Sequence, residues 1–230
     1  MVDRLTQGSK IPPLENGDRL TRFEFERRYN AMPQLKKAEL IEGIVYLPAA
    51  LRFRSHGQPH SWVIGWLITY AAATPGVSTA DAPTVRLDLD NEPQPDAVLL
   101  IDETSGGQSR LSEDDYIEGA PELVVEIAAS SAAIDLHAKK TAYRRNGIQE
   151  YIVWQVLDQK LDWFYLSEGD YLSLPVDSDG IIRSQIFPGL WLAVEALLTG
   201  NLQQVLAVVQ QGTRLPEHAE FVQQLANSPR

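Results

Sequence analysis

"VVEIAASSAAIDLHAKK", residues 124–140, begins as a buried strand with β-branched and aliphatic side chains, and places Glu126 in the middle of that strand. Alternate side chains of a strand point to opposite faces, so Val124, Glu126 and Ala128 share one face. Burying an ionised carboxylate without a partner costs several kcal/mol. We therefore expect Glu126 to be paired, hydrogen-bonded or bound to a cation.

Two neighbouring segments bring further charged groups toward Glu126. The apolar run that begins at Asp96, directly after Pro95, is typical of a strand buried on both faces. If the two strands are neighbours, Asp96 and Glu126 converge on one cation, and Mg²⁺ prefers one or two carboxylates together with water and phosphate oxygens. Lys139 lies in the following helix, predicted over 133–146, from which its ammonium could position a nucleophile or offset charge on a phosphoryl oxygen. These three residue types suit phosphodiester hydrolysis.

Each of these residues also has a structural explanation. Asp96 follows Pro-Gln-Pro and could end a turn. Lys139 comes four residues after Asp135, a spacing that fits a surface ion pair on a helix. Glu126 is the hardest to explain in this way, because it lies inside an apolar strand.

Composition limits the classes of protein. The chain has 230 residues with 44% hydrophobic and 22% charged residues, which suits one sizeable domain with appendages. It has neither an apolar run of about 18 residues nor an apolar N-terminal signal region, so we expect a cytoplasmic protein with no membrane segment. The absence of cysteine excludes disulfides, thiolate zinc sites and cysteine nucleophiles.

The four histidines offer little metal-ligand spacing. Only His56 and His60 are close in sequence, and Gly57 and Pro59 between them argue against a shared helical face. A hard cation held by carboxylates is therefore the metal site that the sequence leaves open.

The formal charge of −11 repels polyanions such as nucleic acids. An enzyme that cuts phosphodiesters nevertheless needs acidic metal ligands and only a local basic rim. The segments "QLKK", "LRFR", "AKK" and "YRR" could supply that rim, although solvated surface charge is the simpler explanation for any one of them.

The remaining chain alternates between strands and helices. Thr21 and Glu24 have the spacing of a capping box for a helix over about 22–30. The pattern then predicts two short strands around Glu42-Gly43, a buried helix over 61–73, strands near 77–80 and 84–89, a polar loop over 102–120, the strand "EYIVWQVL", an antiparallel meander from 158, and C-terminal helices. "NLQQVLAVVQQ" and "GLWLAVEALL" suggest an exposed apolar stripe, from which we expect a homodimer.

The run "PQPDAVLL…GAPELVVEIAASSAAIDLHAKKTAYRRNGIQEYIVW" resembles the PD-(D/E)XK nuclease superfamily, and specifically the restriction endonuclease family of the Uma-two type, long catalogued as a bacterial domain of unknown function. The resemblance covers about residues 20–166 and includes "ELIEGIVYLPAA" and His60 ahead of a helix. The family pattern is P-D, then V-E-V/I, D-x-x-x-K-x-x-x-Y and G-V-x-E-Y-W. It is matched by Pro95-Asp96, Glu126, Asp135, Lys139, Tyr143, Gly147, Glu150 and Tyr151.

The resemblance implies roles for these residues. Asp96 and Glu126 would bind Mg²⁺ or Mn²⁺, and Lys139 would stabilise charge or position water. Glu39 would be an additional ligand, although it could instead pair with Lys36 or Lys37 or end a turn. Ala128 stands where a strict E-x-K motif has its lysine, which fits a lysine that has moved to the helix. Three departures bear on loop geometry more than on chemistry: Ala129 replaces a frequent serine, Ile152 replaces the usual tryptophan, and "SSAA" lacks the usual proline.

We therefore expect an α/β, restriction-endonuclease-like fold with a central mixed sheet flanked by helices, an antiparallel β extension and C-terminal helices. The expected divisions are a tail over 1–19, the nuclease-like domain over 20–190 and a helical extension over 191–230. His60, Lys140 and Arg144 are candidates for contacting substrate, although His60 could simply flank a helix that starts at Ser61.

The expected function is metal-dependent hydrolysis of DNA. Two alternatives share the same residues: a non-catalytic binding or assembly module that keeps the fold, and a metal-dependent hydrolase of small phosphate esters. The acidic net charge favours the first alternative, whereas the presence of Asp96, Glu126 and Lys139 together favours an enzyme.

Overall fold

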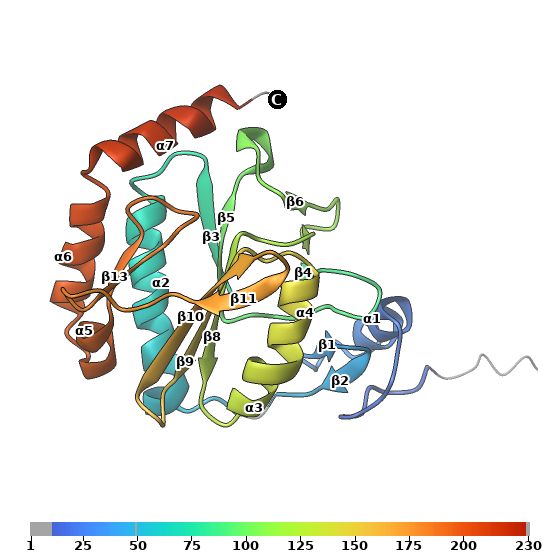
Figure 1. Ribbon diagram of the computed structural model, residues 1–230. Helices are drawn as coiled ribbons and strands as arrows, with labels where there is room; N and C mark the ends of the chain where they lie inside the picture. The colour runs from blue at the N-terminus through green and yellow to red at the C-terminus, as the bar shows by residue number, and fades with distance from the viewer. Residues whose placement is uncertain (1–10, 49, 229–230) are drawn as a thin grey trace, which may run out of the picture.

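The computed structural model describes residues 11–48 and 50–228. A six-stranded sheet of order β11-β10-β9-β8-β5-β3 forms its centre (Figure 1). β8 and β9 are parallel and the other neighbours are antiparallel, so the sheet is mixed, as expected. The strands are β3 (Val77–Asp81), β5 (Ala97–Ile101), β8 (Leu123–Ala128), β9 (Glu150–Gln155), β10 (Lys160–Ser167) and β11 (Asp170–Ser173).

Parallel pairing of β8 and β9 requires a crossover between them, and the chain supplies a helical one. It consists of α3 (Ala132–Ile134), the π-helical turn η3 (Asp135–Lys139) and α4 (Lys140–Arg145). This confirms the helix expected over 133–146. The π turn was not expected, and such turns occur frequently at functional sites.

Each face of the sheet is covered by helices. On one face, α2 (Gln58–Ala71) buries Trp66 and Tyr70 against Leu99 and Val125. On the other face, Tyr143 of α4 packs with side chains from three central strands, namely Val98, Val124, Tyr151 and Val153. Figure 1 shows α2 and α4 on opposite sides of the strands. None of the helices in the described residues combines the length and the apolarity that a membrane crossing requires.

The C-terminal helices complete the core beside α2. They are α5 (Val194–Thr199), α6 (Leu202–Gly212) and α7 (Pro216–Asn227). Val205 and Val209 of α6 are fully buried in the same cluster as Trp66. Figure 1 shows α6 beside α2. The expected exposed stripe is therefore wrong, because α6 uses its apolar face inside the chain. The homodimer stays a prediction without that support.

The antiparallel meander predicted from residue 158 is confirmed only in part. β10 and β11 form the expected antiparallel hairpin, but β12 (Ile181–Arg183) pairs with β13 (Trp191–Ala193) in a separate two-stranded sheet. Pro175 follows the end of β11, and a proline cannot donate a hydrogen bond to a ladder. The chain therefore leaves the large sheet at this point.

The N-terminal part forms a smaller unit around its own apolar cluster. α1 (Arg22–Asn30) confirms the first expected helix, and β1 (Glu39–Ile41) pairs with β2 (Ile44–Tyr46) across the expected turn. Phe25 and Leu40 are fully buried between them. The capping box is wrong, because Thr21 makes no side-chain cap and Glu24 binds Arg27 and Arg28 instead.

Between β3 and β8 the chain forms a three-stranded sheet of order β4-β7-β6 and a short 3₁₀ turn. The expected strand over 84–89 is reduced to β4 (Val85–Arg86). The polar loop expected over 102–120 contains the other elements, namely the 3₁₀ turn η2 (Glu103–Ser105), β6 (Arg110–Leu111) and β7 (Ile117–Glu118).

The backbone of α6 at Gly212 lies close to the backbone of the loop before β13 at Gly189. Substitutions at two glycines test this contact. A Cβ on Gly212 would lie 2.2 Å from the carbonyl oxygen of Gly189, whereas a Cβ on Gly65 of α2 would meet nothing within 4 Å. We expect Gly212→Ala to lower the free energy of unfolding by about 1–3 kcal/mol through overpacking. Gly65→Ala should raise it by about 0.5–1 kcal/mol through helix propensity. Urea unfolding of both variants measures this, and equal effects would contradict the close contact.

Candidate active site

Asp96 and Glu126 lie opposite each other on neighbouring strands. The register pairs Ala97 with Val125, and one further step places Asp96 beside Glu126. The backbone N–H of Ile127 donates to Asp96 Oδ2 over 2.7 Å, which fixes this carboxylate against β8. Opposite residues of an antiparallel pair share a face, so both carboxylates lie on the side that α4 covers. Glu126 therefore lies on the same face of β8 as Val124 and Ala128, as predicted from the alternation of side chains along a strand.

Lys139 binds the carboxylates from the crossover helix. Its ammonium lies 2.9 Å from Glu126 Oε1, 2.8 Å from Glu39 Oε1 and 3.7 Å from Asp135 Oδ1. Lys139 is only 4% exposed and Asp135 only 1%. The explanation of these two residues as a surface ion pair is therefore wrong, because their pairing is buried and shared with two other carboxylates.

Glu39 reaches the cluster from β1, outside the large sheet. Its Oε1 accepts a hydrogen bond from the backbone N–H of Gln94, 2.8 Å away, as well as contacting Lys139. An isolated bridge between Leu40 and Glu92 holds β1 beside the segment that leads to Asp96. The structure thus brings Glu39 together with Glu126 and Lys139, the grouping that the family resemblance implied.

Hydroxyl groups hold the carboxylates in place. The Tyr143 hydroxyl donates to Glu126 Oε1 over 2.7 Å, and the Ser131 hydroxyl donates to Asp135 Oδ2 over 2.6 Å. The Tyr151 hydroxyl donates to the backbone oxygen of Asp135 over 2.9 Å. Tyr143 and Tyr151 are fully buried, so they belong to both the core and the cluster. The sequence did not reveal the burial of Asp135.

The cluster carries more negative charge than Lys139 offsets. Burial raises the pKa of Glu126 to about 8, and Asp135, Asp96 and Glu39 add to this rise while Lys139 opposes it. Burial also raises the pKa of Asp135. Burial alone would lower the pKa of Lys139, but Glu126, Glu39 and Asp135 hold it well above its usual value. At least one of these carboxyls, Glu126, therefore keeps a proton at neutral pH. A second cation bound beside Lys139 would be stabilised by the same excess of negative charge.

Two histidines meet Asp96 from the other side. His56 Nε2 lies 3.1 Å from Asp96 Oδ1, and His60 Nε2 lies 2.6 Å from the backbone oxygen of Asp96. Burial tends to raise the pKa of Asp96, but the His56 hydrogen bond and charge, with Lys37 and the Ile127 N–H, lower it below its usual value.

This arrangement corrects two expectations about the histidines. The π-helical turn η1 (Phe53–Gly57) runs directly into α2, so Gly57 has helical dihedral angles and His56 and His60 lie along one continuous helical segment. Pro59 is the second residue of α2, directly after the π turn, and the continuous segment accommodates it there. His60 also lies inside α2 and does not cap it, since the helix begins at Gln58.

The other substrate candidates lie elsewhere. The Lys140 ammonium sits 3.5 Å from the centre of the Phe164 ring on β10. Arg144 donates to the backbone oxygen of Gly169 and to Asp170 at the β10–β11 turn. The structure therefore does not bring Lys140 or Arg144 to the carboxylates.

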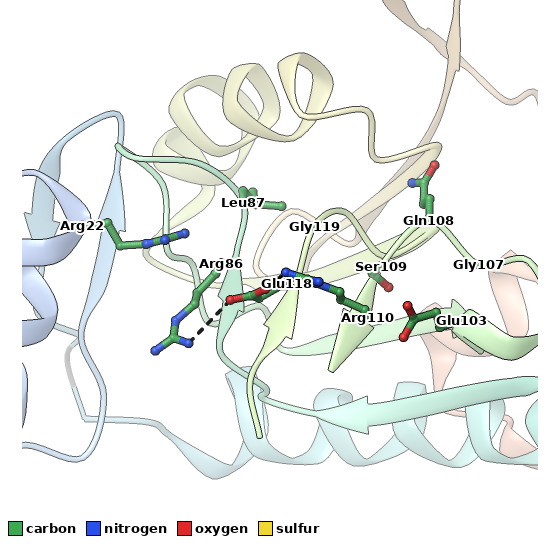
Figure 2. A pocket seen from close by; sticks show the side chains of 10 residues that line it. All are labelled: Arg22, Arg86, Leu87, Glu103, Gly107, Gln108, Ser109, Arg110, Glu118 and Gly119. Atoms are coloured by element: carbon green, nitrogen blue, oxygen red, sulfur yellow. Dashed lines mark hydrogen bonds and ion pairs between the residues drawn. The ribbon is translucent and has the colours of Figure 1, made fainter. Parts of the chain in front are cut away.

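A surface hollow of about 580 Å³ is separate from this cluster (Figure 2). Its three arginines are Arg22, Arg86 and Arg110. Arg86 is already paired with Asp114 and Glu26, and Arg110 with Glu118. The hollow contains neither Asp96 nor Glu126 nor Glu39, so the cluster around Lys139 is the better candidate for chemistry. The hollow is lined by Arg22, Arg86, Leu87, Glu103, Gly107, Gln108, Ser109, Arg110, Glu118 and Gly119.

The mixed sheet with helices on both faces, and acidic residues on its central strands, define a nuclease-like α/β fold. The chain belongs to the Uma2 family, described as "Putative restriction endonuclease", which matches residues 23–195. This confirms the resemblance found in the sequence.

A solved structure shares the fold. It is a crystal structure of "a putative nuclease belonging to DUF820" from Anabaena variabilis ATCC 29413. The TM-score is 0.55 with 13% sequence identity, over 75% of this chain and 96% of the other. At this identity the likeness shows the fold alone. None of the curated proteins matches this chain.

The raised pKa of Glu126 predicts how stability depends on pH. The folded pKa of about 8 exceeds the ordinary value of 4.5, so the metal-free folded protein keeps a proton that the unfolded chain releases. Its free energy of unfolding should therefore fall as pH rises from about 4.5 to about 8. Glu126→Gln removes this loss, and we expect the variant to gain on the order of 2–4 kcal/mol relative to wild type between about pH 5 and about pH 9.

Urea unfolding of both proteins in a chelator measures this difference. Glu92 and Glu150, whose pKa values burial raises to about 8 and about 7, are present in both proteins and cancel from the comparison. A constant difference between the two proteins across the pH range would show that Glu126 is ionised throughout.

Proposed function

We propose that the chain is a metal-dependent endonuclease that hydrolyses DNA phosphodiester bonds, with Asp96 and Glu126 as metal ligands, Glu39 as an additional ligand and Lys139 as the cationic group. The observation that carries the proposal is the placement of Asp96 opposite Glu126 across β5 and β8, with the Lys139 ammonium 2.9 Å from Glu126. Membership of the Uma2 family supports the same reading.

The buried donor set fits a divalent cation such as Mg²⁺ or Mn²⁺. Glu39, Asp96, Glu126 and Asp135 are all buried in this region, and Lys139 is the lysine that contacts three of them. Carboxylates are the protein ligands that these hard ions prefer. When bound, such an ion would polarise a phosphoryl oxygen and lower the pKa of its water.

The chain's own residues divide the remaining work. Asp96 is held by the Ile127 N–H, and Glu126 by the Tyr143 hydroxyl, so both carboxylates are oriented before any substrate arrives. Lys139 keeps its proton, because the carboxylates hold its pKa well above the usual value although burial opposes them. In this role Lys139 offsets charge on a phosphoryl oxygen as a hydrogen-bond donor and does not act as a base.

A basic rim beside the cluster would meet the DNA backbone. Residues 51–54, the segment "LRFR" that leads into η1, are all exposed. Arg52 and Arg54 form no ion pair with any described residue, whereas Arg144 and Arg145 are paired with Asp170 and Glu42. Lys37 lies near enough to Asp96 to contribute to lowering its pKa. Of the basic segments noted in the sequence, "LRFR" and "QLKK" therefore support the proposal best.

Cleavage of plasmid DNA tests the proposal. With Mg²⁺ or Mn²⁺ the wild type should nick or linearise the plasmid and a chelator should stop it, whereas Asp96→Ala and Glu126→Ala should lose activity by at least about two orders of magnitude. Asp179→Ala is the control, because Asp179 is an exposed acidic residue with a side chain 71% accessible. Hydrolysis of bis(p-nitrophenyl) phosphate without DNA cleavage would favour a small-ester hydrolase, and metal binding without any hydrolysis would favour a non-catalytic module.

Lys139→Ala separates the catalytic role of the lysine from its structural one. It leaves Glu39, Glu126 and Asp135 without their cation, so the metal-free variant should lose about 3–5 kcal/mol of stability. Saturating Mn²⁺ should restore part of that stability, while cleavage should stay about a hundredfold below wild type. The control is Lys160→Ala, whose ammonium pairs with Asp162 on β10. Wild-type cleavage by Lys139→Ala in Mn²⁺ would assign the lysine a structural role alone.

A further inference from the structure

Asp96 lies between two groups of donors with different chemistry. On one side are the carboxylates around Lys139, and on the other are the imidazoles of His56 and His60. One ligand atom each from His56, His60 and Asp96 lies within 4.8 Å of the others. We propose that these three residues form a site for a divalent transition ion of borderline softness, such as Zn²⁺, Co²⁺ or Ni²⁺. The binding of this ion does not depend on the proposed function, whereas the reaction that the ion would serve does.

The Nε2 atom of His60 faces two oxygen atoms. His60 Nε2 lies 2.6 Å from the backbone oxygen of Asp96 and 3.0 Å from Asp81 Oδ1. A ring nitrogen carries at most one hydrogen, so one donor is shared between two oxygens. A cation in place of this hydrogen could contact both oxygens and the Nε2 lone pair at the same time.

His56 completes the donor set. Its Nε2 lies 3.1 Å from Asp96 Oδ1, while its Nδ1 is buried and has no hydrogen-bond partner in the described part of the chain. In this arrangement the Nε2–H of His56 faces Asp96 Oδ1, and no described partner fixes Nδ1. The ring proton can therefore move to Nδ1, which leaves Nε2 able to bind a metal. Asp96 Oδ2 is already bound to the Ile127 N–H, so Oδ1 is the oxygen that remains for the ion.

Local structure explains why the two imidazoles converge. They are four residues apart, and the π turn η1 joins α2 without interruption. Two histidines at this spacing on one helical face form a recurrent pair of zinc ligands. The two rings meet edge to face with their centres 5.5 Å apart. One side of the site remains open to solvent, since the Asp81 side chain is 64% exposed, so water or a substrate oxygen could reach the ion.

The donor types select the class of ion. Two imidazole nitrogens and one carboxylate oxygen suit Zn²⁺, Co²⁺ and Ni²⁺, whereas Mg²⁺ prefers oxygen ligands and gives up its waters reluctantly. Glu126 Oε1 is occupied by Lys139 and Tyr143, so Asp96 is the residue that the nitrogen site and the carboxylate cluster share. The protein would therefore bind a borderline ion where the family resemblance alone implies a hard one.

Cobalt(II) provides a direct probe of binding without any substrate. Titration of the untagged protein with Co²⁺ should give visible d–d absorption bands of a nitrogen-containing site, which Zn²⁺ abolishes and a large excess of Mg²⁺ leaves. His56→Ala and His60→Ala should each weaken Co²⁺ binding by at least about tenfold, and the double variant should lose these absorption bands.

The control is His137→Ala, because His137 is exposed on η3 and faces no donor of the site in the described contacts. The glutamine variants His56→Gln and His60→Gln keep side-chain size and guard against loss of fold, which circular dichroism monitors. Unchanged Co²⁺ affinity and spectrum in the folded double variant would overturn this inference, even if Mg²⁺-dependent DNA cleavage persisted. Histidine-dependent Co²⁺ binding without DNA cleavage would leave it standing and overturn the proposed function instead.

Discussion

The ammonium of Lys139 is the interaction on which this part of the molecule depends. It joins Glu126 of the central sheet, Glu39 of the N-terminal hairpin and Asp135 of its own π turn. Burying one of these carboxylates without a cation would be strongly unfavourable, so the sheet, the hairpin and the crossover helix are coupled through a single charge. An excess of buried carboxylates over cations opposes stability, and proteins accept such a cost most often where the charges serve binding or catalysis.

Two π turns place the charged side chains and the imidazole side chains of the two proposed sites. η3 carries Asp135 and Lys139, and η1 carries His56. A π turn widens the helix by one residue, which changes which side chains share a face. The two helical segments approach Asp96 and Glu126 from different directions, because α2 covers one face of the sheet and α4 the other.

Sequence reasoning found the centre of the site because Glu126 contradicts the apolar pattern around it. The strand, the helix after it and the placement of Asp96 all followed from side-chain periodicity and strand pairing. The burial of Lys139 could not be decided in the same way, since a four-residue spacing from Asp135 fits a surface pair equally well. The domain limits and the roles of the site residues stay predictions.

The errors have physical causes that a single sequence does not reveal. Gly57 and Pro59 resemble helix breakers, yet both are accommodated at the start of α2, so the convergence of His56 and His60 was missed. The apolar face of α6 looked exposed because nothing in the sequence identifies α2 and β13 as its partners. In both cases tertiary context overrode a correct local pattern.

The ion pair between Glu39 and Lys139 affects the order in which the chain folds during synthesis. This contact joins residues a hundred positions apart, and contacts of such separation close late because the entropy of a long loop opposes them. During synthesis the N-terminal hairpin emerges well before the helix that neutralises its carboxylate. A growing chain thus carries the Glu39 carboxylate before its cationic partner exists, and the cluster around Lys139 can assemble only after the crossover helix has left the ribosome.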